Sequence, residues 1–465
     1  MSRSVRAHAI PRRGFLGTMA AGAAWAALPS PARAQGADKR PPNLIVLMGD
    51  DCSAREIACY GHKKHQTPNL DALARTGAMF KTCWCTPLCS PTRAEIMTGR
   101  YGFRTRWYHN NMKDRQSLPT RNTIFAQFLK KAGYATAISG KWQLPGTQKA
   151  YGFDESCIWA YENYLPKSVK HAGAYEQPGK PSRYWHPCVL KNGTYLPTKP
   201  DDYGPDIFTD FVIDFAKRHR DRPFLAYYPM SLTHGPFYPT PDSLKPGAEK
   251  LRHDKAANFA ANVAYMDKLV SRIVKALDDL RLRDNTILLF TTDNGTGAAG
   301  KGQAREIGCH VPMIVNGPGH VKPLGPRDEL VDFSDVLPTL LDFAGTSLPE
   351  GYVVDGRSFA PLLRGEAYTP RDWIFSYLAE KRMLRDHRWL LEGNGKFYDC
   401  GDSRDGTGYR DVTASTDPEA VAARKRFEQI LADKPAPKPD DPLFIQYQKQ
   451  IARKKLDRKK ARKKP

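Results

Sequence analysis

Four short apolar runs, each ending in a polar or glycine-containing loop, constrain the fold of this chain more than any other feature. The runs occupy residues 43–48, 135–139, 224–228 and 286–290. Helical stretches separate them, at residues 123–132, 206–218 and 256–280. Continuous β-rich runs that alternate with helices are typical of a mostly parallel sheet covered by helices on both faces. We therefore predict an α/β fold built on one large, mostly parallel sheet.

The pattern changes after about residue 364. Short runs that read as antiparallel strands occupy residues 373–378, 381–384, 389–392 and 396–399. Gly393, Asn394 and Gly395 have the composition of a hairpin turn between the last two runs. Residues 418–431 predict one closing helix, and a proline-rich segment at 434–442 leads to a basic tail. We expect a smaller C-terminal α+β subdomain here.

The first residues have the pattern of an export signal. Arg12 and Arg13 precede an apolar stretch that runs to Leu28, and residues 32–34 read Ala-Arg-Ala, a cleavage-site pattern. This segment resembles a twin-arginine signal peptide. The apolar stretch is too short for a transmembrane segment, and nothing later in the chain resembles one. We expect a periplasmic or secreted protein.

The formal net charge of +22 is concentrated at the two ends of the chain. Residues 1–34 contribute +5 and residues 453–465 contribute +8, so the remainder carries +9. A basic tail of this kind is usually solvated, and contact with a polyanion such as a sulfated glycan is the alternative. Aromatic residues do not interleave with the basic ones, so we expect no nucleic-acid partner.

A cysteine opens the most informative motif of the chain. Residues 89–93 read Cys-Ser-Pro-Thr-Arg, and Ala-Glu-Ile-Met-Thr-Gly-Arg follows directly. Pro91 has a fixed φ and no backbone N–H, which suits the first turn of a helix. Cys89 would then lie at a helix N-terminus, where free N–H groups favour an anion. Arg93, four residues on, returns to roughly the same face and can brace neighbouring carboxylates.

This motif resembles the signature of the type I sulfatases of the alkaline-phosphatase-like superfamily, and the similarity spans most of residues 43–400. The resemblance implies that a formylglycine-generating enzyme oxidises Cys89 to formylglycine, whose hydrate attacks the sulfur of a sulfate ester. The predicted function is therefore a sulfatase, a sulfuric ester hydrolase that cleaves a sulfate monoester. Aromatic and basic residues in segments 107–116, 159–200 and 237–253 favour a sulfated carbohydrate as the substrate.

These patterns together predict the organisation of the chain, and the order of its two domains agrees with what the resemblance implies. Residues 1–34 form the signal peptide, and residues 35–365 form the catalytic domain. Residues 366–433 form the antiparallel subdomain, and residues 434–465 hold the proline-rich segment and the basic tail.

Hard oxygen ligands follow two of the predicted strands. Asp50 and Asp51 come after the first apolar run, and Asp293 and Asn294 come after the fourth. Because ligand groups in such folds gather at the carboxyl ends of the strands, we expect these side chains to lie close together. Carboxylate and amide oxygens suit Ca²⁺ or Mg²⁺. In the resembled family the same pairs hold a divalent ion, usually Ca²⁺, beside the formylglycine, here Cys89.

Three further residues match catalytic positions of the resembled family. Lys141 resembles the lysine that holds the sulfate and the modified residue. His234 and Lys301 match the positions that contact the sulfate and protonate the leaving oxygen. Together with Cys89 and Arg93 they complete the predicted catalytic set.

The chain departs from the family pattern in two places. Gln143 stands where many sulfatases have a histidine that takes up a proton, and glutamine cannot accept one at neutral pH. Either water or another group, with His109 as one option, takes over that role, or turnover is slow. The segment at residues 306–312 is a drifted form of a second family motif, with Ile307 and His310 as the departures.

Two other functions fit the same sequence. A phosphonate monoester or phosphodiester hydrolase of the same superfamily makes similar demands on its cation and nucleophile. A non-catalytic polyanion-binding protein would keep an unconverted Cys89 and use the basic tail for adhesion. The natural ester, endo or exo action, the oligomeric state and the pairing of the other eight cysteines stay open.

Overall fold

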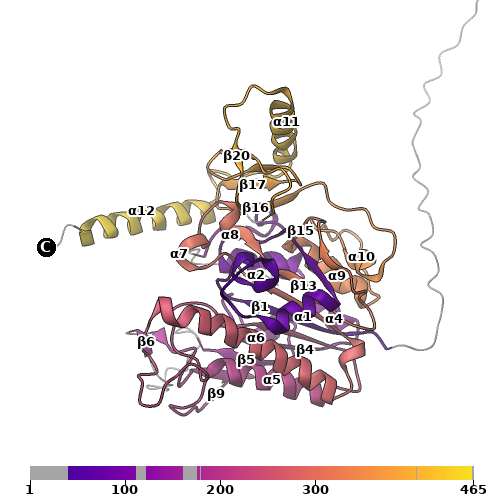
Figure 1. The fold of residues 1–465 in the computed structure, drawn as a ribbon, viewed down its shortest axis with the longest axis vertical. Helices are drawn as coiled ribbons and strands as arrows, with labels where there is room; N and C mark the ends of the chain where they lie inside the picture. Colours follow the sequence, from indigo (N-terminus) through magenta and orange to yellow (C-terminus); the bar gives the residue numbers. More distant parts are fainter. Residues whose placement is uncertain (1–39, 111–121, 161–174, 178–179, 405, 463–465) are drawn as a thin grey trace, which may run out of the picture. The chain divides into compact units, whose positions relative to one another are not determined.

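A ten-stranded sheet lies at the centre of the computed structural model, which describes residues 40–110, 122–160, 175–177, 180–404 and 406–462 (Figure 1). Across the sheet the strands are β14 (Gly325–Arg327), β2 (Ala78–Phe80), β13 (Met313–Asn316), β11 (Thr286–Thr292), β1 (Asn43–Gly49), β10 (Phe224–Pro229), β4 (Ala135–Lys141), β5 (Glu155–Trp159), β8 (Val189–Lys191) and β9 (Thr194–Leu196).

The middle of this sheet is parallel. β11, β1, β10, β4 and β5 pair in parallel in that spatial order. Four of them are the apolar runs that the sequence predicts as strands. β13, β8 and β9 add antiparallel pairings toward the edges. The predicted mostly parallel α/β sheet is therefore confirmed.

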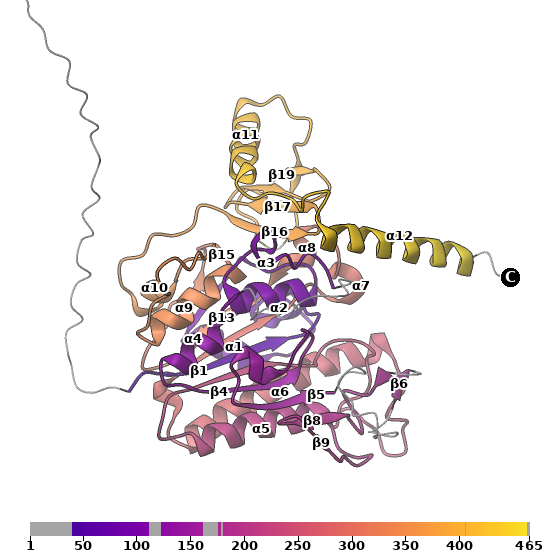
Figure 2. The same ribbon diagram turned by 180° about the vertical axis from the view of Figure 1, so that it is seen from behind.

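Helices cover both faces of the sheet, as the two opposite views show (Figure 1, Figure 2). Along β1, Leu44, Val46 and Met48 pack in one apolar core, while Ile45 and Leu47 pack in the other. The first core is shared with α2 (Cys89–Thr98), α4 (Phe125–Lys131), α9 (Val336–Phe343) and α10 (Ala360–Arg364). The second is shared with α1 (Pro68–Thr76), α5 (Gly204–Arg218) and α6 (Lys255–Asp279). Because side chains alternate along a strand, a fully apolar strand such as β1 is buried from both sides.

A second, antiparallel sheet follows in the C-terminal part of the chain. Its strands are β16 (Ile374–Leu378), β17 (Lys381–Arg385), β18 (Trp389–Leu391), β19 (Phe397–Asp399) and β20 (Arg410–Asp411). The predicted turn between β18 and β19 includes Gly395 at φ +86°, where glycine is favoured because it has no Cβ. α11 (Pro418–Ala432) packs on this sheet through Phe427 and Leu431. The predicted antiparallel strands are present, and the domain boundaries stay predictions.

A final helix, α12 (Pro442–Arg462), runs through the segment that the sequence suggests only as a basic tail. The Asp441 carboxylate accepts a hydrogen bond from the Leu443 N–H at 2.9 Å, and Pro442 opens the helix. Aspartate followed by proline is a common helix start, and lysine, arginine and glutamine are good helix formers. α12 was not predicted, although these signals are present in the sequence.

The remaining elements are short. They are β3 (Cys83–Trp84), β12 (His310–Val311), β15 (Val331–Asp332), β6 (Tyr175–Gln177), β7 (Lys180–Pro181), α3 (Gly102–Thr105), α7 (Gly297–Gly300) and α8 (Glu306–Cys309), with 3₁₀ turns at Ala54–Glu56, Ala58–Tyr60, Gln148–Tyr151, Arg283–Asn285 and Phe333–Asp335.

All nine cysteines lie in the described residues, and none of them forms a disulfide there. None of the helices in the described part of the chain is long and apolar enough to span a membrane. The predicted signal peptide at residues 1–34 lies outside the described residues.

Candidate active site

All nine residues that the sequence predicts for the site are brought together in the structure. They are Asp50, Asp51, Cys89, Arg93, Lys141, His234, Asp293, Asn294 and Lys301. β11, β1, β10 and β4 are adjacent, and because they are parallel their carboxyl ends meet at one edge. Backbone bonds tie these ends together, since the Asp50 N–H donates to Leu232 O at 2.7 Å and the Asp293 N–H donates to Gly49 O at 2.9 Å.

Cys89 is the first residue of α2, as its motif predicts. Pro91 lies in the first turn, and every residue of α2 is buried. The helix ends at Gly99, whose φ of +64° allows the left-handed conformation that closes it. The N–H of Ser90 donates to the Asn110 side-chain oxygen at 2.8 Å. The sequence gives no signal for this role of Asn110, because a single polar residue in a loop has many uses.

Three carboxylates and the cysteine form a compact buried group. One ligand atom from each of Asp50, Asp51, Cys89 and Asp293 lies within 4.8 Å of the others. The Cys89 sulfur lies 3.9 Å from Asp50 Oδ1 and 3.9 Å from Asp51 Oδ1. Asp51 takes a left-handed φ of 60°, and its N–H donates to Asp293 Oδ1 at 3.1 Å.

Asn294 leaves one polar atom unused beside this group. Its Nδ2 donates to Asp51 Oδ1 at 2.7 Å and to Gly295 O at 3.0 Å. Its Oδ1 is buried and has no hydrogen-bond partner among the described residues. Buried polar atoms are rarely left without a partner. An amide oxygen beside three carboxylates has the ligand chemistry of a Ca²⁺ or Mg²⁺ site, so the residues present fit such an ion.

Each carboxylate is paired with its own basic side chain. Lys141 Nζ lies 2.6 Å from Asp50 Oδ2, and Lys301 Nζ lies 2.7 Å from Asp51 Oδ1. Arg93 donates from Nη2 to Asp293 Oδ2 at 2.7 Å and from Nη1 to the Lys141 carbonyl at 3.2 Å. Arg93 therefore connects α2 to the ends of β11 and β4.

The local charges shift the carboxyl groups in opposite directions. Burial alone would raise the pKa of Asp50, but the charges of Lys141 and Lys301 hold it well below its usual range. Burial and the charge of Asp50 raise the pKa of Asp293 to about 6, although Arg93 opposes this. Crowded buried carboxylates repel one another, and a divalent cation between them would relieve that repulsion.

His234 and Cys89 are both neutral at neutral pH. Burial lowers the pKa of His234 to about 3, although Asp50 and Asp51 oppose the shift. Its Nε2 lies 3.6 Å from Asp51 Oδ2. Burial, and then the charge of Asp293, raise the pKa of the Cys89 thiol to about 12. The unmodified thiol is therefore a poor nucleophile, because the thiolate is the reactive form.

Gln143 and His310, which depart from the family pattern, and His109, the alternative proton acceptor, lie in different surroundings. The Gln143 backbone carbonyl lies 3.4 Å from Ser90 Oγ, and its side-chain Oε1 is buried without a hydrogen-bond partner in the described residues. His109 precedes Asn110, and its ring centroid lies 4.7 Å from that of Tyr447 in α12. His310 bonds the backbone carbonyl of Lys81 through Nε2 at 2.9 Å.

Two of the predicted specificity segments are only partly described. Residues 111–116 of the first segment and residues 161–174 and 178–179 of the second lie outside the described residues. The third segment, 237–253, is described throughout.

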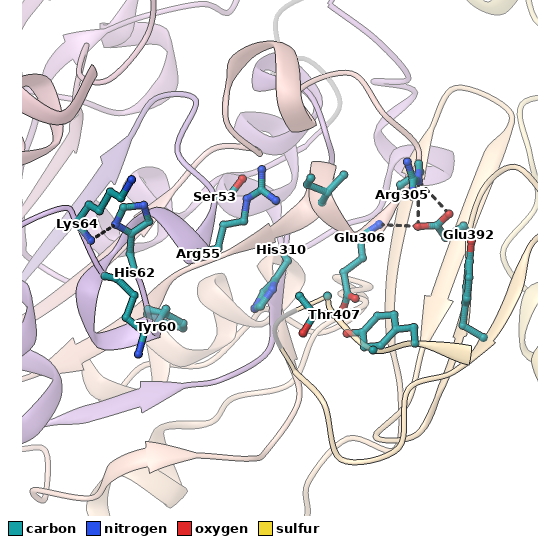
Figure 3. Close-up of a pocket in the computed structure, with 17 residues that line it drawn as sticks. Ser53, Arg55, Tyr60, His62, Lys64, Arg305, Glu306, His310, Glu392 and Thr407 are labelled. Atoms are coloured by element: carbon teal, nitrogen blue, oxygen red, sulfur yellow. Dashed lines mark hydrogen bonds and ion pairs between the residues drawn. The ribbon is translucent and has the colours of Figure 1, made fainter. Parts of the chain in front are cut away.

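A separate cavity of about 800 Å³ opens between the loop at residues 53–64 and the C-terminal residues 392–409 (Figure 3). Its lining includes Arg55, Lys63, Lys64 and Arg305, and Arg305 Nε lies 3.2 Å from Glu392 Oε2. None of the nine predicted site residues lines it. Its walls come from segments far apart in the chain, so the sequence alone did not predict it.

Several known proteins are similar to this chain in sequence. The family model described as Sulfatase matches residues 42–346. The chain is 29% identical over 382 residues to N-acetylgalactosamine-6-sulfatase of Canis lupus familiaris, covering 74% of this chain and 70% of that protein. It is 30% identical over 370 residues to arylsulfatase A of Homo sapiens, covering 73% of this chain and 71% of that protein.

Solved structures share the fold. A sulfatase from Pseudoalteromonas sp. aligns with a TM-score of 0.67 at 20% identity, covering 86% of this chain and 92% of that chain. The phosphonate monoester hydrolase of Agrobacterium radiobacter aligns with a TM-score of 0.59 at 20% identity, covering 84% and 95%. At these identities the two structures support the fold alone. The family model and the curated relatives support the family and the activity as well as the fold. On this evidence of sequence similarity, the chain belongs to the sulfatase family and is a sulfuric ester hydrolase.

Proposed function

We propose that this sulfatase cleaves a sulfate monoester of a sulfated carbohydrate, with a formylglycine made from Cys89 and a bound divalent cation, Ca²⁺ or Mg²⁺. One observation carries the proposal. Cys89 opens a buried helix with its sulfur 3.9 Å from two carboxylates, each of which is paired with a lysine. A purely structural cysteine has no need of such surroundings.

The reacting group would be the oxidised side chain at position 89. Formylglycine supplies a hydroxyl nucleophile in its hydrated form, which the protonated thiol of cysteine cannot replace. The chain supplies the N-terminus of α2, whose free N–H groups favour a negatively charged sulfate. A formylglycine-generating enzyme is then a partner during maturation.

The cation would be held by oxygen atoms of Asp50, Asp51, Asp293 and Asn294. When bound, it polarises the nonbridging oxygens of the sulfate. Arg93 positions Asp293 through the 2.7 Å bond, and its planar guanidinium stays charged at any pH that the enzyme meets.

Three side chains would handle the sulfate and the leaving group. Lys141 and Lys301 are buried or nearly buried ammonium groups that meet the negative charge of the sulfate. Burial alone would lower the pKa of Lys301, but the neighbouring acidic groups raise it above its usual value, so this lysine stays charged. His234 is neutral before the substrate binds, so the proton for the leaving oxygen would come from the charged ammonium of Lys301, and the neutral imidazole would contact the sulfate.

The carbohydrate substrate is supported by one relative, whose name specifies a sulfated amino sugar. We also propose that the chain is exported to the periplasm or secreted, since residues 12–34 have the pattern of a twin-arginine signal.

Matched esters test the proposal. The purified enzyme, produced with a formylglycine-generating enzyme, is assayed with an aryl sulfate, the corresponding aryl phosphonate monoester and a panel of sulfated oligosaccharides. We expect sulfate release that stops on chelation and returns with Ca²⁺ or Mg²⁺, with a higher kcat/KM for at least one oligosaccharide than for the aryl sulfate. Faster cleavage of the phosphonate would favour the alternative hydrolase activity.

A further inference from the structure

The cavity between residues 53–64 and 392–409 is large enough to hold a ligand of its own. Its volume of about 800 Å³ lies in the range of small-molecule binding sites, and a disaccharide fits into such a space. Figure 3 shows His62 and Lys64 on one side of it and Arg305 and Glu392 on the other. The two sides come from distant parts of the chain and enclose space between them.

Basic side chains outnumber acidic ones around this cavity. Its lining holds four basic side chains, Arg55, Lys63, Lys64 and Arg305, and two acidic ones, Glu306 and Glu392. Both carboxylates already have an arginine, since Glu306 pairs with the buried Arg385 and Glu392 Oε2 lies 3.2 Å from Arg305 Nε. Arg55 Nε lies 3.7 Å from Glu56 Oε1, while Lys63 and Lys64 form no ion pair within the described part of the chain. The cavity therefore carries an excess of positive charge.

Aromatic rings stand on both sides of the same space. They belong to Tyr60, His62, Tyr398 and Tyr409. The Tyr60 hydroxyl donates to Phe80 O at 2.9 Å and accepts from the Met313 N–H at 2.8 Å. His62 Nδ1 accepts from the His65 N–H at 2.8 Å. Because these polar atoms are used within the protein, the rings offer a ligand mainly their carbon atoms, which suit the C–H face of a sugar.

The cavity lies next to the loops that carry the candidate cation ligands. Ser53 lines it and follows Asp51 by two residues, so their Cα atoms are at most about 7 Å apart. Ser53 Oγ accepts a hydrogen bond from the Thr296 N–H at 2.9 Å, and Thr296 follows Asn294 by two residues. The cavity is thus a neighbour of the candidate active site, although none of the nine site residues lines it.

We propose that this cavity, with Arg55, Lys63 and Lys64 at its edge, is a second binding site for an anionic sugar unit of the sulfated glycan. The excess positive charge attracts a sulfate or carboxylate group, and the rings pack against the sugar. The inference rests on the proposed function and narrows its substrate to a glycan with at least two acidic units. Two sites that engage one glycan chain reinforce each other, because binding at one raises the effective concentration at the other.

Binding stoichiometry tests the inference with the full-length chain. The test variant carries Arg55→Gln, Lys63→Gln and Lys64→Gln. The matched control carries Lys131→Gln, Lys149→Gln and Lys217→Gln, which remove the same charge at exposed positions elsewhere. All proteins also carry Cys89→Ala. Isothermal titration calorimetry with a sulfated chondroitin disaccharide, and with its unsulfated form, gives the number of sites and their affinities.

We expect two sulfated disaccharides per chain in the Cys89→Ala protein and in the control. In the test variant one of the two sites should weaken at least about tenfold, with a shallower salt dependence, because three charges at its edge are gone. The unsulfated disaccharide should not fill this site. One disaccharide per chain in all three proteins would overturn the inference, as would two sites of unchanged affinity in the test variant.

Hydrogen exchange shows where the second disaccharide lies. Its addition should slow exchange of the backbone N–H groups of residues 61–64 and 406–409 in the control, and much less in the test variant. Protection confined to the candidate active site would contradict the inference. Tighter binding of inorganic sulfate or of adenosine diphosphate than of the disaccharide would also contradict it, because the cavity would then be a site for a bare anion or for a nucleotide.

These binding assays do not depend on turnover, so the two proposals fail separately. An enzyme that hydrolyses sulfate esters but binds a single disaccharide refutes only the inference. A full-length protein that keeps Cys89 and hydrolyses no sulfate ester refutes the proposed function. It also refutes the claim that the cavity holds a second unit of the substrate, whatever binds there.

Discussion

Two buried clusters of carboxylates in this protein look alike in composition, and only one of them has a cysteine and an amide oxygen without a hydrogen-bond partner beside it. The first, here called the open cluster, consists of Asp50, Asp51 and Asp293. The second, the closed cluster, consists of Asp332 and Asp335. Both sit among basic side chains, and both are almost fully buried.

In the closed cluster, protein donors reach every carboxylate oxygen. Arg371 donates from Nη1 to Asp332 Oδ2 at 2.9 Å and from Nε to Asp335 Oδ1 at 2.9 Å. The Ser334 N–H donates to Asp332 Oδ1 at 3.1 Å, and the Asp332 N–H donates to Asp335 Oδ2 at 3.0 Å. The Tyr101 hydroxyl also donates to Asp332, which connects the loop after α2 to this network.

The open cluster has a cysteine in its midst and the unpartnered Asn294 Oδ1 at its side. A buried polar atom without a hydrogen-bond partner costs about 1–3 kcal/mol. A bound ligand that contacts this atom would remove that cost. In this protein, the cluster whose oxygens are all hydrogen-bonded connects elements of the fold. The cluster with an unpartnered amide oxygen beside it indicates a site where a ligand binds and reacts.

The largest expected difference between the two clusters comes from removing the reacting side chain of the open cluster. Cys89→Ala should lower sulfate ester hydrolysis at least about 10³-fold, because no other group in the site can act as the nucleophile. The free energy of unfolding should change far less. Cys157→Ala, at a buried cysteine of β5, serves as the control and should keep its activity. Comparable hydrolysis by the Cys89→Ala enzyme would contradict this account.

Disrupting the closed cluster should instead lower the free energy of unfolding. Arg371→Met leaves two buried carboxylates without their cation and should lower the free energy of unfolding by about 3–5 kcal/mol. Urea unfolding monitored by circular dichroism measures the loss. If the variant does not fold, Tyr101→Phe removes the hydrogen bond donated to Asp332 and the one accepted from Arg371, at a cost of about 1–3 kcal/mol in total. Unchanged stability in both variants would show that the cluster is not structural.

A divalent cation should stabilise the open cluster alone. At about 100 times its dissociation constant, Ca²⁺ should raise the free energy of unfolding by about 2.7 kcal/mol over the chelated protein. Asp51→Asn should reduce this gain. Asp335→Asn should show the same gain from Ca²⁺, although the free energy of unfolding of its chelated form should be lower than that of the parent. Thermal unfolding with and without Ca²⁺ measures both. An identical gain in the two variants would place the ion elsewhere.

Glu95 extends the comparison to pH. Both its carboxylate oxygens are buried without a hydrogen-bond partner in the described residues. Burial, and then the charges of Asp332 and Asp355, raise its pKa well above the usual 4.5. The native state therefore keeps a proton that the unfolded chain releases near pH 4.5, so stability should fall as pH rises from there toward the native pKa.

The slope of that fall should reach about 1.4 kcal/mol per pH unit. Glu95→Gln has nearly the same shape and no titration, so it should lack this part of the decline and be more stable than the parent at pH 7. Urea unfolding of the two proteins between pH 5 and pH 8 makes the comparison. Parallel pH profiles would show that Glu95 is charged in the native state.

The smallest expected effect concerns Gln143. Gln143→His should leave the fold intact and change the step that releases sulfate, by less than about tenfold, because histidine can accept a proton and glutamine cannot. Pre-steady-state release of sulfate separates this step from the first one. A rate that does not change when release limits turnover would remove Gln143 from the account.

The sequence predicted the open cluster well because its residues lie in short motifs at strand ends. Asp50 and Asp293 are 243 residues apart, yet a parallel sheet brings any two adjacent strand ends together, so the fold class was enough to predict their meeting. Asp332, Asp335 and Arg371 follow no comparable motif. Asp332 and Asp335 meet through a local capping box at Phe333–Asp335, but Arg371 reaches them through the bridge between Leu330 and Arg371, which no local pattern encodes.

The same reasoning explains two further gaps. The burial of Glu95 is invisible in the sequence, because a carboxylate in a helix is normally exposed. Asn110 became informative only through its bond to Ser90, which depends on the path of a loop. Pairings set by tertiary packing are accessible only from the structure.

Mass spectrometry of the peptide that contains residue 89, taken from a preparation with measured sulfatase activity, tests the central claim most directly. The account predicts the mass of formylglycine at that position, in a fraction of molecules that scales with specific activity across preparations. Full activity in a preparation whose residue 89 is entirely an intact cysteine would contradict it.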